Sequence, residues 1–253
     1  MAATYSSLEG AQYGAPIGDF GGSKARIFLI LCCIVLLLLG GFFVAVAPST
    51  GSSGDSSGVV ADVIAGAIFL AGALYCAWTI FSWRGAHAQL FEQGFVVSRA
   101  GKTTSARWDD VASVTAKVVV MRYYGIPFWT SRLYTLTLAN GETLRLTNAF
   151  AQASKLGESV QRMSANVLLP RAISSYQTGA TLPFGRFGVS QAGISNGRDT
   201  LPWNDVNQLT FQNGNVIITR KGKMLRWASA PVAKTPNAYV LNLLVGYIQR
   251  GIR

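Results

Sequence analysis

The chain has 253 residues, of which 50% are hydrophobic and only 13% are charged. Soluble globular proteins carry about 25% charged residues, so something other than water solvates part of this chain. Its 22 basic and 11 acidic side chains give a net charge of +11. The only histidine is His87, which excludes most histidine-based catalytic triads and multi-histidine metal sites.

The first 23 residues are rich in Gly, Ala, Ser and Tyr and show no hydrophobic periodicity. Such a composition cannot bury enough apolar surface to offset the entropy of ordering the chain. We therefore expect residues 1–23 to form a disordered cytoplasmic tail.

Two uncharged apolar runs follow, at residues 27–47 and 63–81. At about 1.5 Å per residue, the first run spans roughly 30 Å, the thickness of a bilayer core. The second run leads into Trp83, an aromatic residue suited to the headgroup region. The sequence predicts a transmembrane helical hairpin over residues 24–84, with helices at 27–47 and 59–83.

A cleaved signal peptide is the alternative for the first run, because residues 45–47 (Ala-Val-Ala) resemble a cleavage site. The run is longer than the roughly 7 to 15 apolar residues of a signal peptide. Lys24 and Arg26 precede the first run and Arg84 follows the second, whereas residues 48–58 between the runs have no basic side chain. The positive-inside bias predicts two spans of an inner (plasma) membrane, with the N-terminus and the large C-terminal region in the cytoplasm.

The net excess of positive charge lies in the predicted cytoplasmic region after the second run. Residues 1–83 hold two basic and four acidic side chains, a charge of −2, and residues 84–253 hold 20 basic and 7 acidic ones, a charge of +13. Such a region would be attracted to anionic lipid head groups. The alternative is that the excess serves only the positive-inside bias and solubility.

All three cysteines, Cys32, Cys33 and Cys76, lie inside the predicted membrane helices. They cannot form the disulfide framework of a secreted domain, and their spacing is not that of metal ligands. We expect them to pack as small, polarizable side chains. We expect neither a cofactor nor a metal ion.

The sequence beyond the helices contains an internal repeat. Residues 95–101 align with residues 187–193 at an offset of 92, and the Trp-Asx-Asp-Val steps at residues 108–111 and 203–206 align at an offset of 95. In each copy, strand and hairpin signals follow this step, and then a segment with helical periodicity. The pattern predicts the duplication of one unit.

We assign unit 1 to residues 89–178 and unit 2 to residues 179–253. Each unit is expected to have several antiparallel strands and one C-terminal helix, because a short bent sheet leaves an open end that an amphipathic helix can cover. The predicted fold class is a two-helix transmembrane hairpin followed by a mainly β (α+β) region.

On these features the chain resembles uncharacterised bacterial membrane proteins whose cytoplasmic part is a pleckstrin-homology-like (PH-like) domain, sometimes in tandem. The resemblance covers about residues 89–253. It rests on the glycine-containing first hairpin of each copy, the two Trp-Asx-Asp-Val steps, Phe184-Gly185, and residues 235–239 at the start of the last helix. It implies tandem PH-like barrels, each closed by its helix, and it supplies no active-site residues.

The residue types needed for catalysis are nearly absent. Asp109 and Asp110 are the only adjacent carboxylates, and neighbours in a turn point apart and cap backbone amides. There is no phosphate loop of the GxxxxGK[ST] type. Trp108 and Trp203 are expected in the cores, since aromatic burial dominates small cores. We therefore expect that the protein is not an enzyme.

One candidate binding segment is residues 122–132, predicted as a loop between two strands. It gathers aromatic side chains between two arginines, and such side chains suit both the headgroup region and protein interfaces. The alternative is that its aromatic residues fold back to cover the sheet. The candidate lipid- or partner-binding residues are Arg122, Tyr123, Tyr124, Phe128, Trp129 and Arg132.

A second candidate is the basic hairpin turn formed by Arg220, Lys221, Lys223 and Arg226. Four cations around one turn could contact anionic lipid phosphates or an acidic partner. The alternative is a solvated turn without a ligand. Nucleic acid fits less well, because no stacking platform accompanies the charge.

These features predict a membrane-anchored scaffold or interaction protein. Its cytoplasmic domain would bind a protein partner, an anionic lipid or a second copy of the chain. The alternative is an accessory subunit of a transporter or another membrane complex, in which the two helices dock and the domain stabilises the assembly.

Overall fold

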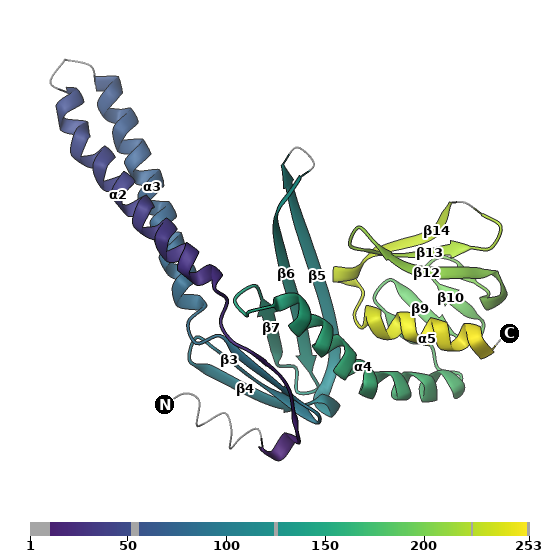
Figure 1. Ribbon diagram of the computed structural model, residues 1–253. Helices are drawn as coiled ribbons and strands as arrows, with labels where there is room; N and C mark the ends of the chain where they lie inside the picture. Colours follow the sequence, from purple (N-terminus) through teal and green to yellow (C-terminus); the bar gives the residue numbers. More distant parts are fainter. Residues whose placement is uncertain (1–10, 52–55, 124–125, 224, 252–253) are drawn as a thin grey trace.

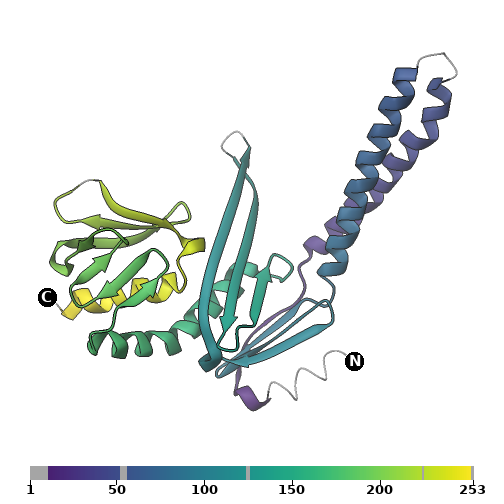
Figure 2. The ribbon, with the colours of Figure 1, turned by 180° about the vertical axis from the view of Figure 1, so that it is seen from behind.

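The protein consists of a helical hairpin followed by a mixed region of helices and antiparallel sheets (Figure 1). The computed structural model describes residues 11–51, 56–123, 126–223 and 225–251. The helical hairpin projects away from the sheets in both views (Figures 1 and 2). At this level the predicted α+β fold class is confirmed.

Helices α2 (Ala25–Gly51) and α3 (Ser56–Ser82) form the hairpin. Within them, Ala25–Ala47 and Val59–Ser82 are apolar segments of 23 and 24 residues, long enough to cross a bilayer. Most of their large apolar side chains are exposed. The hairpin therefore presents an apolar surface on its outside instead of burying it in a core.

Glycines bring the two helices close together. A Cβ atom on Gly66 would lie 2.8 Å from Cγ2 of Val44, and one on Gly40 would lie 3.0 Å from Cγ of Leu70. Beside them, the rings of Phe43 and Phe69 stack with centroids 5.6 Å apart. Small residues at the contact permit this packing, as in many membrane helix pairs.

The N-terminal segment before the helices is part of a sheet. Strand β1 (Pro16–Phe20) pairs with β2 (His87–Phe91), which follows the helices, and Asp19 contacts His87 at 2.8 Å. The backbone N–H of Ser23 also donates a hydrogen bond to Ala149 at 2.8 Å. The prediction of a disordered tail is therefore wrong for residues 11–23. Pairing with a distant strand orders a segment that has no strong pattern of its own.

The first unit contains two antiparallel sheets and a helix. One sheet has the strand order β1-β2-β3-β4 and the other β5-β6-β7. Helix α4 follows β7. The remaining bounds are β3 (Gly94–Arg99), β4 (Lys102–Arg107), β5 (Val111–Tyr123), β6 (Ile126–Leu138), β7 (Thr143–Thr147) and α4 (Ala153–Gln177).

The second unit repeats this order, with sheets β8-β9-β10-β11 and β12-β13-β14 followed by α5. None of the sheets in the described part of the chain is closed, so the predicted barrels are not observed as such. The bounds are β8 (Leu182–Phe184), β9 (Phe187–Ser190), β10 (Gly193–Ser195), β11 (Thr200–Leu201), β12 (Val206–Gln212), β13 (Asn215–Arg220), β14 (Arg226–Pro231) and α5 (Ala238–Gly251).

The two tryptophans of the repeat are buried, as predicted, and they show how the units correspond. Nε1 of Trp108 donates to the carbonyl of Phe91, and Nε1 of Trp203 donates to that of Ser190, both at 2.9 Å. Phe91 and Ser190 differ by 99 positions, as do Gly94 and Gly193, which begin β3 and β10. The predicted offset of 92, which aligned β3 with β9, is therefore wrong by one strand.

With the corrected correspondence, β1 is the counterpart of β8. In unit 2, residues 185–186 alone connect β8 to β9, whereas in unit 1 the whole helical hairpin connects β1 to β2. The hairpin is thus inserted between the first two strands of unit 1. Unit 1 includes β1, which lies outside the residues 89–178 predicted for it.

Helix α4 contributes to the cores of both units. Leu156 and Val160 near its start are buried in the core of unit 1, and Ala165 belongs to the core of unit 2. Its last turns also pack on unit 2, through Leu169 and Ile173. Figures 1 and 2 show α4 running from one unit to the other. One helix therefore links the two hydrophobic cores.

Asn237, just before α5, joins the two units by hydrogen bonds to β5. Its Oδ1 accepts a hydrogen bond from the backbone N–H of Val114 and its own N–H donates to the Val114 carbonyl, both at 2.8 Å. Its Nδ2 donates to the Ala112 carbonyl at 3.3 Å. A residue of unit 2 thus pairs with the free edge of β5, which would otherwise expose backbone polar groups.

We predict that Gly157→Ala destabilises the protein. Gly157 lies under the Tyr134 ring, whose atoms would be only 2.1 Å from an added Cβ. Overpacking of this kind costs about 1–3 kcal/mol, measurable as a lower melting temperature of the detergent-solubilised protein. Gly246→Ala on α5 is the matched control, because its Cβ would meet only the end of Arg250 at 3.8 Å. Equal melting temperatures for the two variants would contradict the packing described.

Candidate functional site

Residues 122–132, predicted as a loop, form the end of the long β5–β6 hairpin. Backbone pairing continues from Met121 with Trp129 to Tyr123 with Ile126. The loop prediction is therefore wrong for residues 122–123 and 126–132, because these residues belong to the paired strands β5 and β6. The side chains of Arg122, Tyr123, Tyr124, Phe128 and Trp129 lie outside the described residues.

Beyond Leu133 the hairpin continues as a ribbon of two strands, because β7 pairs with β6 only over residues 133–137. We call residues 118–123 and 126–132 the β5–β6 ribbon. Val118, Val119, Val120 and Met121 in this ribbon are 38–49% exposed. Successive strand residues point to opposite faces, so apolar side chains are exposed on both faces of the ribbon.

The β5–β6 ribbon and the helical hairpin project to the same side of the sheets. Both rise upwards in Figure 1, and they do so again after the half-turn of Figure 2. If α2 and α3 cross a membrane, the ribbon extends from the domain towards that membrane. The structure therefore brings one candidate segment to the side of unit 1 from which the helical hairpin projects.

Asn148 supports the base of the β5–β6 ribbon where β7 ends. Its Oδ1 accepts a hydrogen bond from the backbone N–H of Arg132 at 3.0 Å, and its Nδ2 donates to the Thr130 carbonyl at 2.7 Å. The Asn148 side chain thus forms the hydrogen bonds to β6 that the backbone of a longer β7 would form. The sequence alone does not distinguish Asn148, because a single asparagine after a strand gives no distinct signal.

The basic turn, which joins β13 to β14, lies in unit 2, whereas the β5–β6 ribbon belongs to unit 1. Figures 1 and 2 place the turn between β13 and β14 at the end of the molecule away from the helical hairpin. Nη2 of Arg220 contacts Oδ2 of Asp205 at 2.7 Å, whereas Lys221, Lys223 and Arg226 are exposed. The structure does not bring this turn together with the β5–β6 ribbon, so the two predicted binding segments do not form one site.

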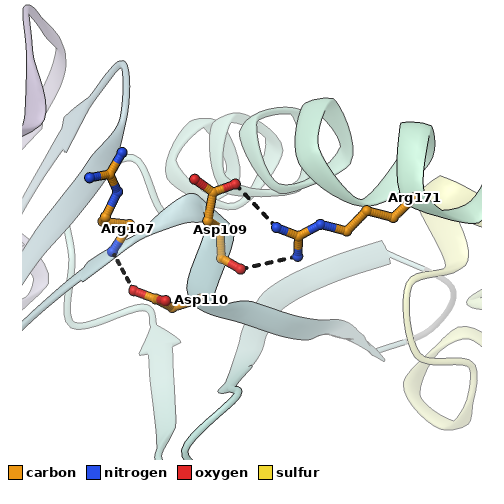
Figure 3. Close-up of polar contacts among 4 residues, drawn as sticks. All are labelled: Arg107, Asp109, Asp110 and Arg171. Carbon is orange, nitrogen blue, oxygen red and sulfur yellow. Dashed lines mark hydrogen bonds and ion pairs between the residues drawn. The ribbon is translucent and has the colours of Figure 1, made fainter.

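The adjacent carboxylates Asp109 and Asp110 point apart (Figure 3). Oδ2 of Asp110 accepts a hydrogen bond from the backbone N–H of Arg107 at 3.4 Å, which confirms the predicted capping role. Asp109 instead contacts Arg171 of α4, with Oδ1 3.2 Å from Nη2. The pair therefore stabilises the turn and its contact with α4, and it lacks the opposed geometry of an acid–base pair.

Among the residues that the structure describes, no group of three or more His, Cys, Asp or Glu side chains could hold a metal ion. Two predicted segments are exposed at the surface: Val118 to Met121 of the β5–β6 ribbon, and the basic turn of unit 2.

The whole chain, residues 1–253, matches a family of unknown function, DUF6585, and the protein belongs to that family. The match includes the helical hairpin as well as both units. No curated protein matches the chain.

Replacement of Asn148 by alanine should loosen the β5–β6 ribbon without unfolding the protein. The change removes two hydrogen bonds, each worth about 1 kcal/mol, so amide hydrogen exchange at residues 130–132 should accelerate by up to about thirtyfold. Asn140→Ala, in the β6–β7 turn, is the control, because it removes a hydrogen bond of 2.8 Å to the Glu142 amide. Unchanged exchange in the ribbon would refute the supporting role of Asn148.

Proposed function

We propose that the protein is a membrane-anchored, non-catalytic scaffold. In this proposal α2 and α3 span the inner (plasma) membrane, and the two units lie on its cytoplasmic side. The length of the apolar helices and the exposure of their side chains support the anchor. The basic residues flanking the hairpin support the orientation.

The pairing of β1 with β2 supports two spans and a retained first helix. Both strands belong to one sheet, so the two ends of the helical hairpin lie on the same side of any membrane that it crosses. Signal-peptide cleavage after Ala47 would separate β1 from that sheet. The signal-peptide alternative is thus disfavoured.

We further propose that both units are PH-like. Each has four antiparallel strands, three antiparallel strands and a helix in that order, and the helix packs on the core. This repeated order supports the resemblance inferred from the sequence. A domain of this kind needs no catalytic group to act as a binding platform.

The observation that carries the scaffold proposal is the exposed β5–β6 ribbon. A two-stranded ribbon with apolar side chains on both faces is marginally stable in water. Another apolar surface that packs against these faces would stabilise it. The bilayer core is a poor cover, because the open edges of the ribbon would leave backbone polar groups without hydrogen bonds. A membrane-associated protein, including a second copy of this chain, can cover the faces and pair with an edge.

Val120→Asp should abolish this association. Val120 is 43% exposed on the ribbon, and a carboxylate there would have to be desolvated against an apolar partner. The matched control is Ile17→Asp on β1, where the side chain is 48% exposed. Both changes should alter unfolding free energy by only about 0.5 kcal/mol.

The measurement is the size of the complex extracted from membranes with digitonin. We expect the parent and Ile17→Asp to migrate as a complex and Val120→Asp to migrate as the chain alone. Extraction of two differently tagged copies distinguishes a second copy from another protein. A parent that migrates alone, or a complex that survives Val120→Asp, would show that the ribbon is not the docking surface.

A further inference from the structure

A groove with a volume of about 310 Å³ lies between the two sheets of unit 1, beside the end of α3. Strands β3, β4 and β7 form its walls, with Val97 and Leu144 as apolar lining. Its charged side chains come from two separate parts of the sequence, the β3–β4 turn and the start of β7. They are Arg99, Lys102, Glu142 and Arg145.

Hydrogen bonds hold this groove against the end of the second apolar span. Nε of Arg99 donates to the carbonyl of Ser82 at 3.1 Å, and the Ala100 amide donates to the carbonyl of Arg84 at 2.7 Å. Ser82 is both the last residue of the apolar span and part of the groove lining. If α3 crosses a membrane, the groove therefore lies at the level of the lipid head groups.

The groove has an excess of positive charge. Lys102 contacts Glu142 at 2.7 Å, and this hydrogen bond lowers the pKa of the Glu142 carboxyl group. Neither Arg99 nor Arg145 forms an ion pair with any described residue. Burial, and then the positive charge of Arg145, lower the pKa of Arg99. Two neighbouring guanidinium groups thus lack a counter-ion that an anionic ligand would supply.

We propose that this groove binds the phosphate of an anionic phospholipid head group, with Arg99 and Arg145 as its ligands. Guanidinium groups bind phosphate oxygens through paired, charge-assisted hydrogen bonds. Val97 and Leu144 provide an apolar wall for the less polar part of the lipid. The proposal rests on the proposed membrane anchor. It concerns a different part of the surface from the basic turn of unit 2.

Arg145→Gln tests the proposal. It removes one charge, and no hydrogen bond or ion pair of the Arg145 side chain with a described residue is lost, so the fold should be retained. The full chain is placed in nanodiscs of phosphatidylcholine with a minor share of phosphatidylglycerol, and the bound lipid is measured by native mass spectrometry. Loss of a charge-assisted contact should weaken phosphatidylglycerol binding by about tenfold or more.

Arg198→Gln is the control, because Arg198 is an exposed arginine of unit 2 and the change removes the same charge. We expect it to retain phosphatidylglycerol like the parent. Equal retention by the parent and Arg145→Gln, or equal loss in both variants, would overturn the proposal.

A second arm distinguishes lipid from free phosphate. Inorganic phosphate is titrated against the parent in nanodiscs of phosphatidylcholine alone, and we expect no saturable binding. Saturable binding that Arg145→Gln abolishes would assign the groove to a soluble phosphate compound and reject the lipid. Membrane fractionation after a carbonate wash tests the anchor separately: a parent chain released by the wash would reject the anchor, and with it the lipid site.

Discussion

The pairing of β1 with β2 is the constraint on which the rest of the structure depends. It joins a strand before the helical hairpin to a strand after it, so both ends of the hairpin are attached to one sheet. The contact of Asp19 with His87 and the hydrogen bond from Ser23 to Ala149 strengthen this attachment. A domain joined to a membrane helix through a single flexible linker can rotate freely, whereas this one is attached twice. The double attachment gives the ribbon and the groove a defined position relative to the helices.

The two units depend on each other through shared elements. Helix α4 supplies Leu156 to one core and Ala165 to the other, and Asn237 of unit 2 pairs with the edge of β5. Removal of unit 2 would therefore expose both an apolar helix face and an open strand edge. The second unit, with its short β12–β13 hairpin, stabilises the longer hairpin of the first. The repeat has thus diverged into a supporting copy and a copy that carries the exposed apolar ribbon.

Sequence patterns predicted the features that depend on local composition. The apolar runs identified the two helices, and the Trp-Asx-Asp-Val steps identified the buried Trp108 and Trp203. Features that depend on distant pairing were missed. Strand β1 has its partner across the entire helical hairpin, and the offset of the repeat was wrong by one strand because similar glycine-containing turns recur along each sheet. The groove was not predicted, because its arginines belong to β3 and β7 and meet only in the folded chain.

The position of β1 has a consequence for biosynthesis. During translation β1 emerges before either membrane helix, and its partner β2 emerges only after both. If α2 and α3 are inserted into a bilayer, the first sheet can assemble only after the chain has crossed and returned. A chain in which one helix failed to insert would leave β1 and β2 in different compartments, each with an unpaired edge. If the helices span a membrane, completion of this sheet therefore requires that both of them insert.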